Sequence, residues 1–150
     1  MLTGAVILTT GSQTLVTCSS ILEAGAPISW SSKKQTLVTL SSTEAEYIAL
    51  CEAGKEALWL SQILKDFNEH VTEPPVIYED NQSCIKMLQS EKSCHRTKHI
   101  ATKYHFIRDL YKQNDIAVKY CASGQMTADM LTKPLEAVKL RQFVKDTGLV

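Results

Sequence analysis

The sequence predicts an α/β fold, in which helices pack on the faces of a mixed β-sheet. Three features of the 150-residue chain indicate this fold class. Short β-favouring runs come first, a long segment with helical periodicity follows, and helical and strand-like segments then alternate. This order of elements is typical of a mixed sheet flanked by helices.

Four runs rich in β-branched residues predict antiparallel strands in the first part of the chain, at residues 5–10, 14–18, 27–31 and 36–40. Gly11, Gly25 and the sequence "SSKK" separate them, as the turns of a meander require.

Between residues 42 and 68 the periodicity changes to that of one amphipathic helix, because apolar residues recur at i, i+3, i+4 and i+7. Ser41 with Glu44, and Thr43 with Glu46, both have the spacing of a capping box. The two glutamates also favour the helix dipole, so capping alone can explain their presence in the first turn.

The remaining elements alternate. The apolar run "VIY" at 76–78 predicts a strand buried on both faces of the sheet. A helix is expected to begin near Asn81, a second to span residues 97–112, and a last strand to span 116–120. Two short helical pieces follow, divided at Pro134. Trp30 and Trp59 lie in apolar surroundings, and we expect both in the core.

Composition limits the cellular setting more than the function. The 16 basic and 16 acidic side chains cancel, so net charge identifies no partner. Five scattered cysteines without a CxxC pair argue against a disulfide framework and for a reducing compartment. The apolar beginning lacks a basic flank and is too short to span a bilayer. We therefore expect an intracellular protein, cytoplasmic or nuclear, that does not enter a membrane.

Acidic residues lie at three junctions between predicted elements. Asp80 follows the strand "VIY" at its carboxyl end, where ligands of open α/β sheets collect. Asp129 begins a helix after the last strand, and Glu46 lies at the start of the long helix. Carboxylates converging from three elements could hold one divalent ion, as metal-dependent phosphodiesterases require.

Five segments resemble, in order, the ribonuclease H domain of copia-type retrotransposon Pol polyproteins: "ISWSSKKQ", "LSSTEAEYIAL", "YEDNQSCIKM", "RTKHIATKYHFIRDLY" and "ADMLTKPL". The resemblance covers residues 24–135. It implies a ribonuclease H-like fold with a five-stranded mixed sheet. It also implies cleavage of the RNA strand of an RNA–DNA hybrid by two Mg²⁺ ions that four carboxylates hold. In the parent polyprotein a reverse transcriptase domain lies upstream.

The resemblance assigns three of the four carboxylates, as catalytic residues and metal ligands: Glu46, Asp80 and Asp129. It leaves Glu44 as a capping residue. The fourth, an aspartate on the first strand, has no counterpart, because Glu23 is the first acid in the chain and lies in a predicted turn. We divide the chain into an atypical N-terminal segment, residues 1–20, in the position of the first strand, and a ribonuclease H-like domain, residues 21–150. We expect weakened binding of Mg²⁺, or of Mn²⁺ in its place, and little cleavage by this chain alone.

Residues 81–112 contain seven basic side chains and two acidic ones, with aromatic residues between them. Such a segment can follow a phosphate backbone, although it can also be the solvated face of a helix. Given the resemblance, we predict that its basic residues contact nucleic acid, and we name Lys92, Arg96, Lys98, Lys103 and Arg108.

Other functions fit the sequence less well. Cys94, His95 and His99 could contribute to a zinc site, but no second cysteine pair completes a tetrahedral set. Neither a nucleophile elbow nor a Gly-rich phosphate loop is present. Two alternatives to an active nuclease stay open: a non-catalytic nucleic-acid-binding module, and a decayed remnant of a transposon.

Overall fold

The computed structural model describes residues 5–10, 14–21, 27–35, 38–68, 73–90 and 98–147. Within these ranges the strands form one sheet in the order β3-β2-β1-β4-β5. The strands are β1 (Ala5–Thr10), β2 (Thr14–Ile21), β3 (Pro27–Lys34), β4 (Val76–Glu79) and β5 (Ala117–Tyr120). The first three are antiparallel neighbours, whereas β4 runs parallel to both β1 and β5. The predicted mixed α/β architecture is thereby confirmed.

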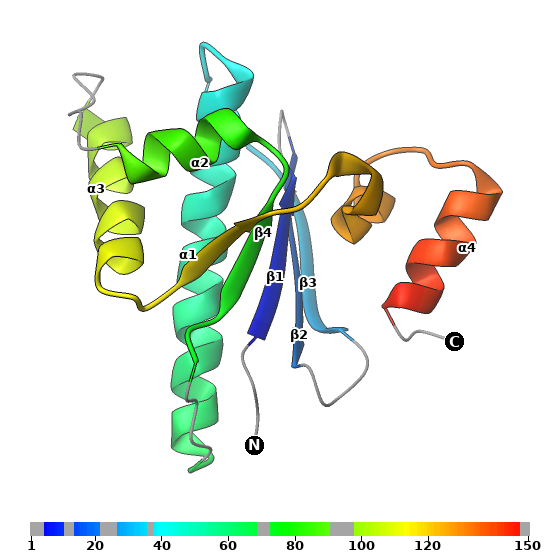
Figure 1. Ribbon diagram of the computed structural model, residues 1–150, viewed down its shortest axis with the longest axis horizontal. Helices are drawn as coiled ribbons and strands as arrows, with labels where there is room; N and C mark the ends of the chain where they lie inside the picture. The colour runs from blue at the N-terminus through cyan, green and yellow to red at the C-terminus, as the bar shows by residue number, and fades with distance from the viewer. Residues whose placement is uncertain are drawn as a thin grey trace.

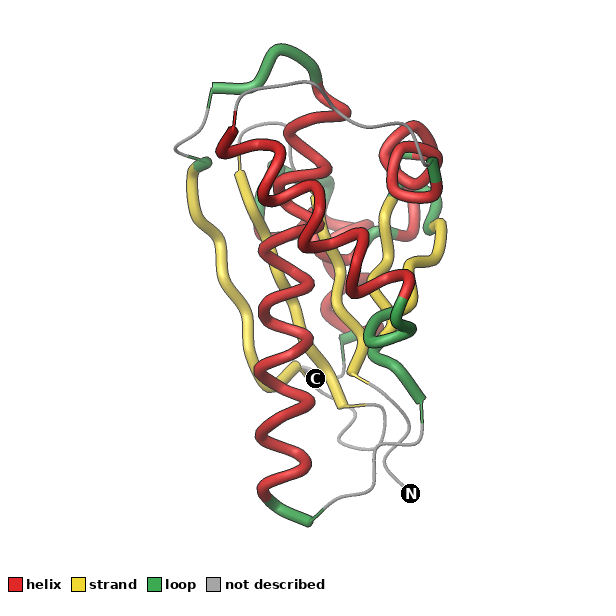
Figure 2. Tube along the Cα trace, turned by 90° about the vertical axis from the view of Figure 1, so that its left-hand side faces the viewer, coloured by secondary structure: helices red, strands yellow, loops and turns green. Residues whose placement is uncertain are grey.

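The helices divide between the two sides of the sheet (Figure 1). On one side lie α1 (Ser42–Asp66), α2 (Gln82–Gln89) and α3 (Lys98–Lys112). On the other side are the short 3-10 helices η1 (Ser123–Gln125) and η2 (Thr127–Leu131), followed by α4 (Ala137–Asp146). Figure 2 shows α1, the longest of the described helices, lying along the strands. None of the described helices combines the length and the apolar character needed to cross a membrane.

The main core lies between the sheet and the layer formed by α1, α2 and α3. Tyr47 of α1 stacks on Tyr104 of α3, with ring centroids 3.9 Å apart, and its hydroxyl donates to the Tyr104 carbonyl. The two helices approach closely at Gly54, where a Cβ would lie 2.5 Å from Cδ1 of the buried Ile107. This contact explains the glycine in the middle of a helix, where the residue otherwise costs about 1 kcal/mol relative to alanine.

One predicted strand is absent. Of residues 36–40, the described part (38–40) has no strand structure, and residues 36–37 lie outside the described residues. The segment connects β3 to α1, and its backbone is committed to the helix start: the Leu40 N–H donates to Oε2 of Glu44. Val38 and Leu40 are about nine-tenths exposed, so the apolar pattern did not indicate burial here.

Three expectations about burial are also wrong. Trp30 on β3 is 65% exposed and Trp59 on α1 is 54% exposed, so neither lies in the core. Strand β4 is not buried on both faces, because its residues alternate between half-buried and buried, and Ile77 and Glu79 are the buried ones. The apolar run predicted equal burial on both faces of β4, whereas α1 covers the face of Ile77 and Glu79 more fully than the other face is covered.

Candidate metal and nucleic-acid site

The start of α1 is held by three side-chain contacts that fix the position of Glu46. Ser41 caps the helix by accepting from the Glu44 N–H, and the Glu44 carboxylate accepts from the Leu40 N–H. Gln35 donates from Nε2 to the Ala45 carbonyl at 2.9 Å, and so ties the end of β3 to the first helical turn. The predicted capping role of Glu44 is confirmed.

The junction between β4 and α2 places two further carboxylates. Asn81 caps α2, with its side-chain oxygen accepting from the N–H groups of Ser83 and Cys84. Glu79, the last residue of β4, is fully buried, and its Oε1 accepts from the Asn81 N–H at 3.0 Å. Asp80 lies between the strand and the helix and is half-buried.

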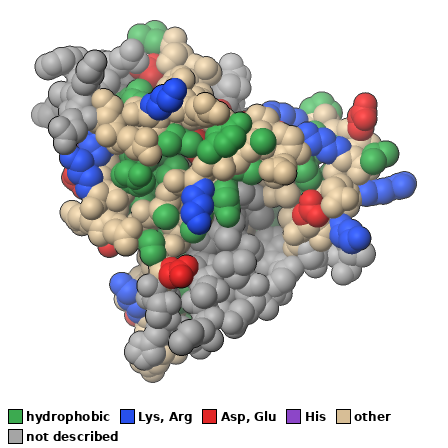
Figure 3. Space-filling model, viewed as in Figure 1, with side chains coloured by type: hydrophobic (Ala, Val, Ile, Leu, Met, Phe, Trp, Pro, Cys, Tyr) green, Lys and Arg blue, Asp and Glu red, His purple; other side chains and the backbone are tan. Residues whose placement is uncertain are grey.

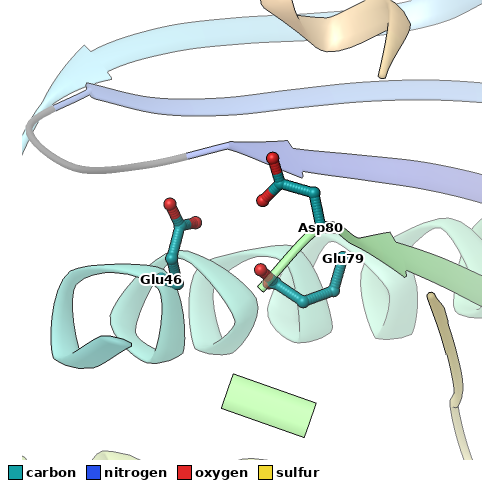
Figure 4. A group of neighbouring side chains, drawn as sticks. All are labelled: Glu46, Glu79 and Asp80. Carbon is teal, nitrogen blue, oxygen red and sulfur yellow. The ribbon is translucent and has the colours of Figure 1, made fainter. Parts of the chain in front are cut away.

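Glu46, Glu79 and Asp80 form an acidic cluster, in which one carboxylate oxygen from each residue lies within 4.8 Å of the others. Figure 4 shows Glu46 extending from α1 toward the end of β4, where Glu79 and Asp80 lie. The structure thus brings together two of the three predicted acidic residues, Glu46 and Asp80. The third member, Glu79, was not among the predicted site residues. Its signal was the two-residue alternation of a strand, which puts it on the same face as Ile77.

The field of this cluster extends to the first turn of α2. Burial, together with the negative charges of Glu79 and Glu46, raises the pKa of the Cys84 thiol far above its usual value. Cys84 is therefore a neutral core residue. Cys121, which follows β5, is partly buried, and burial and the nearby Asp80 raise the pKa of its thiol as well.

Asp129, the other predicted ligand, is buried within η2. Its Oδ1 forms an ion pair with Nζ of Lys133, 2.8 Å away and one helical turn later in the chain. It is not a member of the cluster that Glu46, Glu79 and Asp80 form. A lysine cation therefore occupies one oxygen of this carboxylate.

Two of the five basic residues predicted to contact nucleic acid make contacts within the protein. Nζ of Lys103 lies 2.7 Å from Oε1 of Glu52 and joins α3 to α1. Arg108 is 7% exposed, donates to the Met87 carbonyl and lies over the Tyr104 ring. In this position the guanidinium packs within the helical layer, and its role in nucleic-acid binding stays a prediction.

The other three basic residues are less completely described. Lys98 is the first residue of α3, while Lys92 and Arg96 lie outside the described residues, as do Cys94 and His95 of the zinc alternative. On the face seen in Figure 3, the described Lys and Arg side chains are scattered, and hydrophobic side chains occupy the middle. The described part of this face therefore presents no continuous basic patch.

Comparisons with known proteins identify relatives and a fold. No family model matches the chain. It is 39% identical over 124 residues to the retrovirus-related Pol polyprotein from transposon RE2 of Arabidopsis thaliana, an alignment that covers 83% of this chain. It is 44% identical over 110 residues, or 73% of its length, to the Pol polyprotein from transposon TNT 1-94 of Nicotiana tabacum. The chain spans only 8% of each of these polyproteins.

Solved structures agree on the fold. The chain resembles LC11-RNase H1, isolated from compost, with a TM-score of 0.59 and 16% identity, covering 85% of this chain and 91% of that one. The same enzyme in complex with an RNA/DNA hybrid gives a TM-score of 0.57 with 15% identity, covering 85% and 92% of the two chains. At such identities the likeness shows the ribonuclease H-like fold, which confirms the expected fold class.

Proposed function

This chain is a homologue of copia-type retrotransposon Pol polyproteins with the ribonuclease H-like fold, and on that premise we propose that it binds RNA–DNA hybrids while its metal-dependent cleavage of them is severely impaired. The observation that carries the proposal is the pairing of an acidic cluster with a first strand that has no acid. Strand β1 (Ala5–Thr10), whose sequence is AVILTT, lies directly beside β4, where the cluster begins.

The donor set of the cluster fits a divalent ion such as Mg²⁺ or Mn²⁺. Its ligands are all carboxylate oxygens, which hard cations prefer. Oxygens that share one Mg²⁺ at about 2.1 Å lie at most about 4.2 Å apart. The oxygens of Glu46, Glu79 and Asp80 lie within 4.8 Å, so they need to move by less than about 1 Å to meet that requirement. A bound ion would supply Lewis-acid stabilisation of the charge that develops on the phosphate during hydrolysis.

The residues of the chain have distinct parts in this proposal. Glu46 and Asp80 hold the ion from two different elements, so its position depends on the packing of α1 against β4. In the arrangement that the family resemblance implies, Asp129 contributes from the other side, and its pairing with Lys133 opposes that contribution. We propose that β1, which lies within residues 1–20, takes the place of the family's first strand without supplying its ligand, so that a second ion is not retained.

Cleavage is tested with a hybrid whose RNA strand is labelled. Three proteins are compared in Mg²⁺ and in Mn²⁺: the natural chain, a graft in which an aspartate-bearing first strand replaces β1 (Ala5–Thr10) and leaves β2 in place, and the same graft with Asp80→Asn. We expect little product from the natural chain, cleavage by the graft, and none by the graft with Asp80→Asn. Robust cleavage by the natural chain would contradict the importance of the missing ligand. An inactive but folded graft would show that the site has decayed further; it would favour the binding module if hybrid is still bound, and the transposon remnant if it is not.

For hybrid binding we propose that Lys92, Arg96 and Lys98 contact phosphates, and that Lys103 and Arg108 support the packing of α3 against α1 and α2. Affinity should fall as salt rises, because counterions are released on binding. Replacing the first three residues with alanine should reduce the salt slope by roughly two to three, about one for each lost contact. An unchanged salt slope would indicate a solvated surface instead.

A non-catalytic nucleic-acid-binding module is the second candidate function, and the absence of a first-strand acid favours it. The hybrid assay separates the two candidates, since a module of this kind binds with a salt-dependent affinity and yields no product even after the graft. In either case we propose an intracellular setting and a reverse transcriptase domain upstream, on the support of the Pol polyprotein relatives.

A further inference from the structure

We propose that Glu79 is a metal ligand in this protein and that it completes, with Glu46 and Asp80, a site for one divalent ion. This inference rests on the proposed function, because it concerns the same acidic cluster. It adds a residue that the family resemblance does not assign, and it replaces Asp129 as the third carboxylate of the site.

The position of Glu79 follows from the strand that carries it. Parallel pairing with β1 on one side and β5 on the other fixes β4 within the sheet. Along β4, the side chains of Ile77 and Glu79 point to the same face, and both are fully buried. That face packs against α1, which carries Glu46, because Ile77 shares a core cluster with Tyr47 and Leu50 of α1. A hydrogen bond from the Asn81 N–H to Oε1 further orients the carboxylate.

The negative charges of the three carboxylates also favour a bound cation. Three carboxylates with oxygens within 4.8 Å repel one another, and burial of Glu79 and Glu46 strengthens this repulsion because water screens it poorly. A divalent cation relieves the repulsion among all three at once. Strand β1 contributes no acid here, so without Glu79 the ion would have only two carboxylates from this side of the sheet.

Asp129 is a poorer candidate for the third ligand in this structure. Oδ1 of Asp129 already has a cation, Nζ of Lys133, at 2.8 Å. A metal ion would have to displace or share that contact, whereas the oxygens of Glu79 are already beside those of Glu46 and Asp80. The two ligand sets therefore predict different effects of single substitutions.

The test measures Mn²⁺ binding to the full chain by electron paramagnetic resonance of the free ion. The variants are Glu79→Gln, Asp80→Asn and Asp129→Asn, with Asp109→Asn on the exposed surface of α3 as the matched control. Glutamine has the shape of glutamate and keeps an acceptor for the Asn81 N–H. We expect Glu79→Gln and Asp80→Asn to weaken Mn²⁺ binding at least roughly tenfold, the loss that even an outer-shell partner can cause. Asp129→Asn should weaken it by a smaller factor, and Asp109→Asn should match the parent.

Thermal unfolding with Mn²⁺ and with EDTA supplies a second readout that does not depend on activity. In EDTA, Glu79→Gln should unfold at a higher temperature than the parent, because one of three repelling charges is removed. In Mn²⁺ the parent should gain more stability than the variant, since only bound metal stabilises the native state. A variant that is already unfolded in EDTA would contradict this expectation directly.

The outcomes separate the inference from the proposed function. If Asp80→Asn weakens Mn²⁺ binding and Glu79→Gln does not, the metal site stands and the role of Glu79 is overturned. If Asp129→Asn has the larger effect, the ligand set implied by the family resemblance is the right one. If the parent itself binds no Mn²⁺, both the inference and the metal dependence of the proposed function fail, while salt-dependent hybrid binding is unaffected.

Discussion

Replacing Arg108 with alanine should lower stability much more than it changes the affinity for nucleic acid. The guanidinium donates to the Met87 carbonyl at 3.4 Å and lies 5.9 Å from the centroid of the Tyr104 ring. At this length the hydrogen bond is worth about 1.5 kcal/mol, the lower end for charged groups. The cation–π contact adds about 0.5 kcal/mol. Loss of two buried methylene groups adds about 1.5 kcal/mol.

The expected destabilisation is therefore about 3.5 kcal/mol, which for a chain of this size corresponds to a fall in Tm of roughly 7–14 °C. The assay is thermal unfolding followed by circular dichroism, with hybrid affinity measured at a temperature where the variant is folded. Lys112→Ala is the matched control, because Lys112 is an exposed basic residue at the end of the same helix. It should cost no more than about 1 kcal/mol.

The two variants lose the same charge, so their effects on hybrid affinity should be similar and small. The reasoning is refuted if Arg108→Ala keeps the Tm of the parent while its affinity falls far below that of Lys112→Ala. That result would mean that the guanidinium leaves its packed position to contact phosphate.

Three further predictions concern other contacts. Burial raises the pKa of Glu52, but hydrogen bonds from Lys103 and Lys55 outweigh this effect and hold the pKa below its usual value. The ionised Glu52 therefore stabilises the fold above about pH 4.3, and this stabilisation is lost as the pH falls. Glu52→Gln should therefore lower the free energy of unfolding at pH 7 but not at pH 3, as urea titrations at both pH values would measure; an equal difference at both would contradict the pairing. Because the pKa of the Cys121 thiol is raised, its alkylation at pH 8 should be slower than that of free cysteine. Asp80→Asn should accelerate the alkylation, as peptide mass spectrometry would measure. An unchanged rate would exclude Asp80 as a cause of the raised pKa. Asn114 has a φ of 60°, so Asn114→Ala should cost about 1 kcal/mol in chemical unfolding and Asn114→Gly should cost less; the opposite order would mean that the backbone shifts.

The elements that sequence predicts well here are those whose local pattern and tertiary setting agree. The long helix was expected to extend to residue 68 and ends at Asp66, and the expected capping by Ser41 and Glu44 is present. The run at 36–40 has equal β-propensity to the real strands, yet its described part is irregular. The difference between this run and the strands does not lie in the local sequence. It arises because the Gln35 side chain and the Leu40 backbone form hydrogen bonds that fix the start of α1.

The candidate site could likewise be predicted from the sequence only where local pattern and tertiary setting agree. Glu46 and Asp80 could be found because each lies at a junction between elements. Strand alternation places Glu79 on the same face as Ile77, but it does not show that this face is covered, since the complete burial of Glu79 depends on the packing of α1 against β4. The ion pair between Asp129 and Lys133 was visible as an i, i+4 spacing. The burial of Arg108 and the ion pair of Lys103 could not be predicted from the basic segment, because spacing alone does not show which side of a helix is covered.

Helix α4 has its principal contacts with η2, the segment that contains Asp129. Figure 1 shows it standing apart from the layer of α1, α2 and α3 on the far side of the sheet. A helix attached through one short segment can open without global unfolding, so its amide hydrogens should exchange with solvent through a local event of low free energy. Segment η2 also contacts β1 and β2, so such an opening leaves it supported by the sheet. We therefore expect the amides of α4 to exchange faster than those of the layer that carries Glu46, Glu79 and Asp80, and Asp129 to stay packed against the sheet while α4 is open.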